Sequence, residues 1–303
     1  MESGVIDVDS LAGGFDLQST LESGQSYLWW REDGRDYEDD SQYGGDASYL
    51  TTTREDGTPA VVRVRQTDGQ VRWESAVDAE SAVRRRLRLD DDLVEIRDAT
   101  PADELLETAF DTYRGMRLVR DPPFGALVSF ICSAQMHVTR IHGMQQSLRA
   151  AFGTPVEFDG ETYHAYPTPA QLADATEEQL RDLSLGYRAP YVKRTAKMVA
   201  DGEADPADAR ELPYEEARDA LTEFVGVGDK VADCVLLFSL DYLEAVPLDT
   251  WIRKTITEYY PDCDRGNYTD TSRAIRERLG GKYAGYAQTY VFQFIRNHRS
   301  TDV

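Results

Sequence analysis

The sequence predicts an α+β protein in which an N-terminal antiparallel β domain, residues 1–99, precedes an all-α domain over residues 100–303. One observation is a set of Asp-Gly dipeptides, which favour tight hairpin turns, within the first hundred residues. They lie at Asp33-Gly34, Asp56-Gly57 and Asp68-Gly69. The other is a change of period, because apolar residues recur at almost wholly helical spacing beyond Thr100-Pro101. A chain of 303 residues is long enough for two or three packed units.

The third Asp-Gly pair separates the clearest strands of the N-terminal domain. Val62 and Val64 alternate with arginines, and the same period of two continues at Val71 and Trp73. Such alternation indicates strands with one buried face, joined here into a twisted antiparallel sheet. Two further elements are expected, a helix and an acidic surface loop, over residues 76–89 and 201–210.

A glycine hairpin at Gly226-Val227-Gly228 is the most informative pattern of the helical part. Glycines on both sides of one apolar residue let the chain turn with positive φ and leave backbone N–H groups uncovered for a phosphate. Apolar residues at Val231, Cys234 and Phe238 then predict a buried helix that runs to about Leu240. The unpaired N–H groups at the start of that helix also favour an anion. By itself the pattern fits a structural helix–turn–helix as well as it fits a phosphate-binding hairpin.

Lys230 lies just inside this helix and is a candidate nucleophile. The chain has five lysines against twenty-eight arginines, so an amine at this position indicates a need that arginine cannot meet. An amine can lose its proton and attack carbon, whereas a guanidinium stays protonated. The helix N-terminus and partial burial are expected to favour the neutral amine. An ordinary exposed lysine of the first turn is the alternative.

Asp249 follows nineteen residues after Lys230 and is expected to cap the next helix. Pro247 ends the preceding segment, and a new helical pattern starts at Thr250. A structural cap is one interpretation of this carboxylate. The other is that it lies at the mouth of the same hairpin and stabilises positive charge that develops on a sugar ring.

The net charge of −22 and a sequence pI near 4.5 are opposite in sign to the usual basic footprint of a DNA-binding protein. Together with the scarcity of lysine, this acidity predicts a protein adapted to molar salt, where the Debye length is only about 3 Å. Three scattered cysteines and four histidines without ligand spacing predict neither a disulfide framework nor a metal site. The chain shows no membrane-length apolar run and no signal peptide, so a cytoplasmic monomer without a cofactor is expected.

Several segments, in the same order, resemble the helix–hairpin–helix DNA glycosylase superfamily and, within it, the 8-oxoguanine DNA glycosylase/lyase family. Besides the hairpin and Asp249, they are SGQSY at 23–27, PPF at 122–124, SFICS at 129–133, RIHGM at 140–144, LGYRA at 185–189 and YAGYAQ at 283–288. The resemblance implies two helical lobes. One is built from segments before about residue 145 and after about residue 265, and the hairpin lobe, about 145–265, lies between them with DNA across the cleft.

The resemblance also implies roles for individual residues. Lys230 would attack the anomeric carbon of the damaged nucleotide and form a Schiff base that permits β-elimination, and Asp249 would stabilise the transition state. Gly24 would offer its carbonyl to the N7 hydrogen that distinguishes 8-oxoguanine from guanine, while Gln288 reads the Watson–Crick edge. Cys234 and Phe292 would stack on the two faces of the extruded base, which an enzyme must take out of the duplex to reach.

The implied partner is double-stranded DNA that contains 8-oxoguanine, with cytosine as the expected opposite base. Arg140 and Arg188 match the arginines that hold the orphaned cytosine, and Tyr187 belongs to the same signature. The chain departs from the family pattern at two further DNA-contact positions. Gln135 begins the segment where other members have three asparagines, and Trp251 replaces a histidine near the lesion phosphate.

The sequence is also compatible with two other functions. The first is a glycosylase of the same superfamily that removes other lesions, such as alkylated purines. The second is a non-catalytic DNA-binding module in which Gly226 and Gly228 clamp the backbone and the lysine is incidental.

Overall fold

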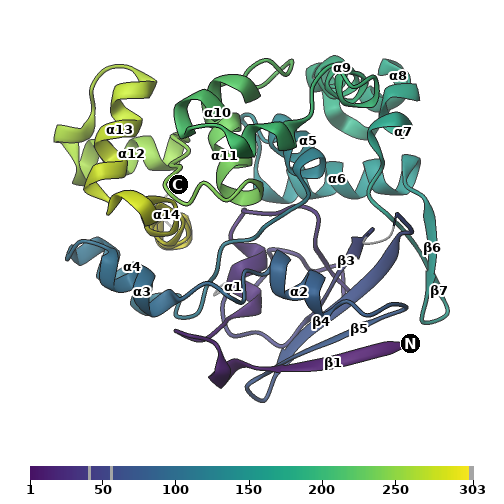
Figure 1. Ribbon diagram of the computed structural model, residues 1–303, viewed down its shortest axis with the longest axis horizontal. Helices are drawn as coiled ribbons and strands as arrows, with labels where there is room; N and C mark the ends of the chain where they lie inside the picture. The colour runs from purple at the N-terminus through teal and green to yellow at the C-terminus, as the bar shows by residue number, and fades with distance from the viewer. Residues whose placement is uncertain (40–41, 55–56, 300–303) are drawn as a thin grey trace.

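The computed structural model describes residues 1–39, 42–54 and 57–299. Its N-terminal part is a five-stranded antiparallel sheet in the order β1-β5-β4-β3-β2 (Figure 1). These strands are β1 (Glu2–Asp7), β2 (Trp30–Arg31), β3 (Ser48–Thr53), β4 (Ala60–Thr67) and β5 (Gln70–Ser75). The predicted N-terminal antiparallel sheet is therefore confirmed.

The turn between β4 and β5 follows the predicted Asp-Gly signal. Thr67 pairs with Gln70, so the turn has two residues, and Asp68 and Gly69 both have positive φ, 51° and 72°. Positive φ at both central residues is what a type I′ hairpin turn requires. Val64 and Trp73 are buried on the core side of this hairpin, as the alternation predicts. Asp56 of the second Asp-Gly pair lies outside the described residues.

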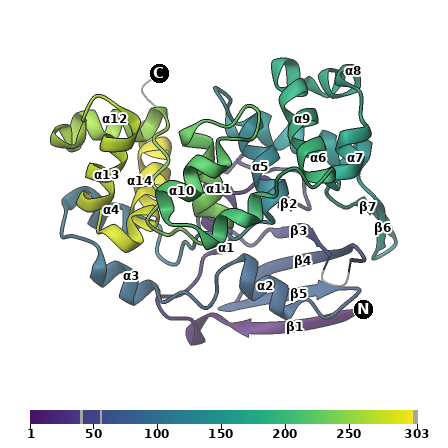
Figure 2. The ribbon, with the colours of Figure 1, turned by 45° about the horizontal axis from the view of Figure 1, so that its top comes forward.

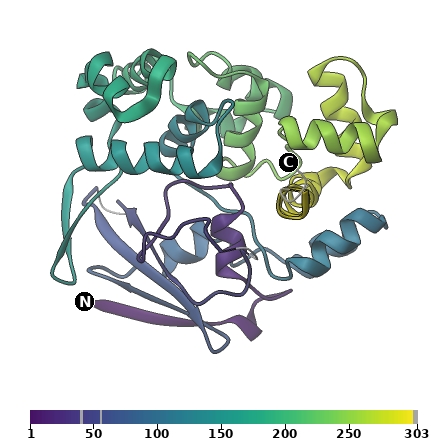
Figure 3. The same cartoon turned by 180° about the vertical axis from the view of Figure 1, so that it is seen from behind.

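The remaining chain is mainly helical and forms a layer above the sheet in Figures 1 and 3. The α-helices are α1 (Leu17–Glu22), α2 (Glu80–Arg86), α3 (Leu93–Ala99), α4 (Glu104–Thr112), α5 (Pro123–Cys132), α6 (Val138–Phe152), α7 (Pro169–Asp174), α8 (Glu177–Leu180), α9 (Ala189–Ala200), α10 (Tyr214–Leu221), α11 (Asp229–Ser239), α12 (Thr250–Tyr259), α13 (Tyr268–Arg278) and α14 (Ala284–Arg299). Helix α2 is shorter at both ends than the helix expected over residues 76–89.

A second hairpin, β6 (Pro155–Phe158) and β7 (Glu161–His164), corrects the expectation that the chain beyond Pro101 is almost wholly helical (Figure 2). Its turn is another Asp-Gly pair, with φ of 53° at Asp159 and 82° at Gly160. Phe158 packs with Leu50 and Val61 of the main sheet, so tertiary contact supports these short strands.

The segment 201–210 is only partly the acidic surface loop that was expected. A 3₁₀ helix, Pro206–Glu211, begins within it, and Pro206 and Ala209 are buried. Segments far apart in sequence also meet at α14, where Tyr290 stacks on Phe110 of α4 with ring centroids 4.1 Å apart. This contact joins the C-terminal helix to the chain before residue 145.

Candidate active site

A cavity of about 860 Å³ brings together the predicted catalytic and base-binding residues. Its walls come from the loop after α1, the C-terminal end of α5, the first turns of α11 and α12, and α14. Nine of the thirteen predicted site residues line it: Gly24, Gln135, Gly228, Lys230, Cys234, Asp249, Trp251, Gln288 and Phe292. Arg140, Tyr187, Arg188 and Gly226 lie outside its lining.

The two hairpin glycines have different backbone conformations. Gly226 has a φ of 86°, and an added Cβ would lie only 2.7 Å from the Tyr191 ring, so both conformation and space require glycine. Gly228 is the N-cap of α11 with φ of −108°, and no atom lies within 4 Å of the position of its Cβ. The turn thus uses positive φ at Gly226 alone, and the missing side chain of Gly228 leaves the start of α11 uncovered.

Lys230 directs its amine toward the C-terminal end of α5. Its Nζ donates a hydrogen bond to Oγ of Ser133 at 3.0 Å and lies 5.9 Å from the centroid of the Phe130 ring. The Ser133 hydroxyl donates its own hydrogen to the carbonyl of Phe130 at 2.7 Å, so its oxygen accepts the hydrogen bond from the amine. The half-buried lysine is thus held at the cavity wall by the neutral hydroxyl of Ser133, with the buried Cys234 thiol as a second neutral neighbour.

Asp249 caps α12, as predicted. One carboxylate oxygen, Oδ1, accepts the backbone N–H of Ile252 at 2.8 Å, and the residue itself has extended backbone. Burial raises the pKa of the Asp249 carboxyl, while the N–H of Ile252 and the positive charge of Lys230 act against that rise. The carboxylate therefore lies in a weakly solvated place where it stabilises nearby positive charge more strongly than it would in water.

The residues predicted to bind the base lie on three different segments. Gly24 has a φ of 82°, and an added Cβ would lie 3.2 Å from Nη1 of Arg296 and 3.6 Å from the Phe292 ring. Burial raises the pKa of the Cys234 thiol to about 12, so it acts as an apolar contact surface rather than as a nucleophile. Gln288 is 5 % exposed, and its Oε1 has no hydrogen-bond partner among the described residues.

Arg296 is a cavity residue that sequence reasoning missed. Its Nη2 donates to the carbonyl of Glu22 at 2.8 Å, and its guanidinium lies 5.5 Å from the Phe292 ring centroid. The spacing of Gln288, Phe292 and Arg296 could have revealed it, because residues four apart share one face of a helix. Arg296 is 9 % exposed and places a buried positive charge beside Gly24.

The predicted DNA-contact residues outside the cavity differ in exposure. Tyr187 is 55 % exposed and Arg140 is also exposed, whereas Arg188 is only 3 % exposed. Arg188 donates through Nη2 to the carbonyl of Ala134, and its guanidinium lies 4.3 Å from the Tyr187 ring centroid. Gln135 is exposed and has a φ of 55°, a conformation that costs energy in a non-glycine residue and places it at the rim.

Possible metal ligands do not gather at this cavity. Among residues 1–39, 42–54 and 57–299, no group of three or more His, Cys, Asp or Glu side chains is placed to hold a metal ion. The three cysteines are free and buried. No helix in the described part of the chain is both long and apolar enough to span a bilayer.

Two family models cover most of the chain. Residues 8–127 match the N-terminal domain of 8-oxoguanine DNA glycosylase, and residues 128–280 match the HhH-GPD superfamily base excision DNA repair protein. A probable N-glycosylase/DNA lyase of Methanothermobacter thermautotrophicus is 32 % identical, with 94 % of each chain covered. The N-glycosylase/DNA lyase of Saccharomyces cerevisiae is 28 % identical over 91 % of this chain and 82 % of its own length.

Solved structures give the same result. MBOgg1 in complex with a low-affinity DNA ligand matches with a TM-score of 0.82 and 27 % identity, with 98 % of this chain and 99 % of the other covered. The 8-oxoguanine glycosylase/lyase of Clostridium acetobutylicum, bound to duplex DNA with cytosine opposite 8-oxoguanine, matches with a TM-score of 0.79 and 28 % identity over 94 % and 93 % of the two chains. The chain belongs to the HhH-GPD superfamily of base-excision DNA repair proteins.

Proposed function

We propose that the protein removes 8-oxoguanine from duplex DNA and then nicks the strand, as a bifunctional DNA glycosylase and lyase. The observation that carries this proposal is that one amine, Lys230, and one carboxylate, Asp249, open onto the same cavity as Gly24, Cys234 and Phe292. The relatives that cover nearly the whole chain are N-glycosylase/DNA lyases, which supports both halves of the reaction.

Recognition of the damaged base would depend on hydrogen-bonding groups of the cavity that only 8-oxoguanine can satisfy. The carbonyl of Gly24 would accept the N7 hydrogen of 8-oxoguanine, which guanine lacks. Oε1 of Gln288 is a buried acceptor that none of the described residues pairs, and the edge of a flipped base would supply a donor. A buried polar group that the wrong base leaves unpaired costs about 1–3 kcal/mol, so these contacts discriminate strongly.

The chemistry would begin with the neutral amine of Lys230 attacking C1′ while the bond to the base breaks and the base leaves with the electron pair. Asp249 would stabilise the positive charge that develops on the sugar. The nitrogen then gives up a proton, O4′ takes up a proton as the ring opens, and a protonated Schiff base forms at C1′. Removal of a C2′ proton then expels the 3′ phosphate, which leaves with the electrons of the C3′–O bond. Ser133 supports this role because it holds the amine at the cavity wall without adding a charge.

DNA would approach across the hairpin, with Gly228 and the uncovered N–H groups of α11 at a phosphate. Gln135 is suited to fill the space left by the base, and exposed Arg140 to contact the opposite cytosine. Arg188 is fixed by Ala134 and Tyr187, so it would position this loop as well as contact DNA. The proposal places the enzyme on chromosomal DNA in the cytoplasm.

Excision from matched duplexes tests the proposal. The substrates hold 8-oxoguanine opposite each of the four bases, with unmodified guanine and 3-methyladenine as control bases, in concentrated KCl. We expect excision of 8-oxoguanine, fastest opposite cytosine, and no release of guanine. Release of 3-methyladenine in preference to 8-oxoguanine would contradict the proposal and favour an alkylpurine glycosylase, the activity of a Bacillus subtilis relative that is 26 % identical over 53 % of this chain.

A further inference from the structure

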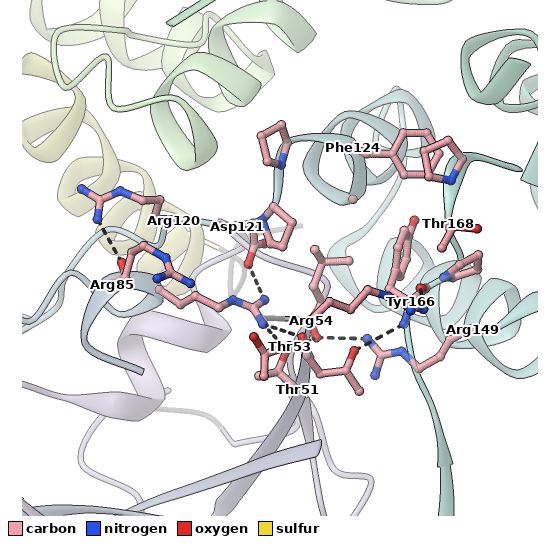
Figure 4. A pocket seen from close by; sticks show the side chains of 18 of the residues that line it. Thr51, Thr53, Arg54, Arg85, Arg120, Asp121, Phe124, Arg149, Tyr166 and Thr168 are labelled. Carbon is pink, nitrogen blue, oxygen red and sulfur yellow. Dashed lines mark hydrogen bonds and ion pairs between the residues drawn. The ribbon is translucent and has the colours of Figure 1, made fainter. Parts of the chain in front are cut away.

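A second cavity, of about 750 Å³, lies at the opposite end of α5 from Lys230 (Figure 4). It is enclosed by β3, the end of α2, α6 and the loop before α7. It shares no lining residue with the catalytic cavity. The ten residues of α5 separate the two by about 15 Å at 1.5 Å per residue.

This cavity is strongly basic in a chain whose net charge is −22. Its described lining holds six arginines and two aspartates, a difference of +4. The arginines are Arg54, Arg85, Arg86, Arg120, Arg149 and Arg210. Because acidic residues dominate the rest of the composition, such a concentration of positive charge in one concave site indicates an anionic ligand.

Arg149 is the deepest of these arginines and is not fully partnered. It is 3 % exposed, its Nη2 donates to the carbonyl of Leu28 at 3.0 Å, and its guanidinium stacks 3.7 Å from the centroid of the Trp30 ring. Its Nε and Nη1 have no hydrogen-bond partner among the described residues. Figure 4 shows the side chain reaching from α6 toward the interior of the cavity.

The buried charges at this site do not balance. Arg86 pairs with Asp121 at 2.9 Å and also donates to Oγ1 of Thr51 at 2.7 Å, so the carboxylate is already engaged. Burial lowers the pKa of Arg149 to about 9, which leaves it charged at neutral pH. Two buried guanidiniums therefore share one carboxylate, and a bound anion would offset the remaining positive charge.

Two further features favour a phosphate attached to a flat group. Helix α5 begins at this cavity without a side-chain cap. Its N-cap and first residue, Pro122 and Pro123, have no N–H, so the free N–H groups at its positive end are those of Phe124 and Gly125, which line the same cavity as Arg149. Arg54, which is half-buried, also lines the cavity and donates to the carbonyl of Tyr166 at 3.3 Å. Phe124 and Tyr166 provide aromatic surface on the remaining wall, and the volume lies within the range of small-molecule sites.

We propose that this arginine cavity binds a small organic phosphate of nucleotide size. The phosphate lies between Arg149, Arg54 and the start of α5, and a flat ring lies against Phe124. The site is independent of the reaction at Lys230, because it lies at the other end of α5 and opens between the sheet and the helical layer.

Calorimetric titration of the full chain with adenosine monophosphate, adenosine and inorganic phosphate tests the proposal. Adenosine monophosphate is expected to bind at least about tenfold more tightly than either fragment, because each fragment lacks half of the contacts. Arg54→Gln is expected to weaken that binding about tenfold, the loss of one charge-assisted contact. Arg149→Met should abolish it, and Arg194→Gln, on the exposed face of α9, should leave it unchanged.

Arg54 is half-buried, so its variant remains informative if Arg149→Met does not fold. Absence of adenosine monophosphate binding would overturn the proposal, as would unchanged affinity in Arg54→Gln. Equal affinity for inorganic phosphate would overturn the predicted contact with the ring. Displacement by a duplex that carries a stable abasic analogue would assign the binding to the catalytic cavity and contradict a separate site.

Discussion

The two ends of α5 differ in how their cations are held. At the C-terminal end, Lys230 donates to the neutral hydroxyl of Ser133 and lies beside the neutral thiol of Cys234. At the N-terminal end, Arg86 is fixed by a carboxylate and by two oxygens of β3, and Arg149 is stacked on Trp30. One end therefore presents an amine that is free to react, and the other presents guanidiniums that are fixed in position.

This difference explains why the chain uses its rare lysine at one end and arginine at the other. An amine can become neutral and form a bond to carbon, whereas a guanidinium stays charged and binds oxyanions with fixed geometry. Substitutions at the catalytic cavity should therefore reduce catalysis with little loss of stability. Substitutions among the buried charges of the arginine cavity should reduce stability with little loss of catalysis.

Asp249→Asn tests the catalytic end and has the largest expected effect. Removal of the negative charge should lower the single-turnover excision rate about 10²–10³-fold, the usual effect of losing one transition-state electrostatic group. Asparagine also caps helices well, so the thermal midpoint should change little. Asp92→Asn at the exposed N-cap of α3 is the matched control and should leave the rate unchanged. An Asp249→Asn variant with the parent rate would refute the electrostatic role.

Asp121→Asn tests the arginine end. The substitution leaves Arg86 without its carboxylate partner and Arg149 without a nearby negative charge, so we expect a loss of about 3 kcal/mol in the free energy of unfolding. Urea denaturation measures this loss. Asp201→Asn, which breaks the exposed pair with Lys197, is the control and should cost about 0.5 kcal/mol or less. If the two variants lost equal stability, the buried charges would not be coupled as described.

The hairpin glycines provide a matched pair within the catalytic region. Gly226→Ala combines a positive φ with a 2.7 Å approach to Tyr191, so we expect a loss of about 1–3 kcal/mol in stability. Gly228→Ala has an ordinary φ and open space, so its loss should be smaller, about 0.5–1 kcal/mol, because alanine caps a helix less well than glycine. Thermal denaturation of both variants in the same salt measures the two losses. Equal losses would contradict the different backbone roles of Gly226 and Gly228.

The pH dependence of stability gives the smallest expected effect. Burial raises the pKa of Asp249 in the folded protein above its usual value of 3.8, so the ionised carboxylate reduces stability at neutral pH. That cost disappears as pH falls through the folded pKa toward 3.8, because the folded state then takes up the proton. Asp249→Asn should therefore melt slightly above the parent at pH 7, and the difference should shrink at lower pH. If the difference in melting temperature between the variant and the parent grew toward low pH, the pKa of Asp249 would be lowered rather than raised in the folded protein.

Much of the catalytic cavity could be predicted because its parts are local in sequence. The hairpin, Lys230 and Cys234 lie within one short segment, and Asp249 starts the next helix, so capping and periodicity place them together. Gly24 and Gln288 lie more than two hundred residues apart, and only the family resemblance joined them. Arg296 was missed although it continues the four-residue spacing of α14.

Other features depend on contacts that no local pattern encodes. The arginine cavity draws Arg54 from the residue after β3, Arg86 from α2 and Arg149 from α6, which become neighbours only when the sheet meets the helices. The hairpin of β6 and β7 carried the same Asp-Gly signal as the N-terminal turns, but its strands are four residues long. Packing of Phe158 on the main sheet supports it, and this contact is not visible in the sequence.

In the proposed reaction, the amine of Lys230 forms the covalent bond to the sugar. Borohydride reduction during reaction with an 8-oxoguanine duplex should trap a stable protein–DNA adduct with the parent and with Lys254→Gln, which removes an exposed lysine 5.4 Å from the ring centroid of Trp251. Lys230→Gln should bind the same duplex and yield neither free base nor adduct. An adduct formed by Lys230→Gln would show that another group forms the bond to the sugar.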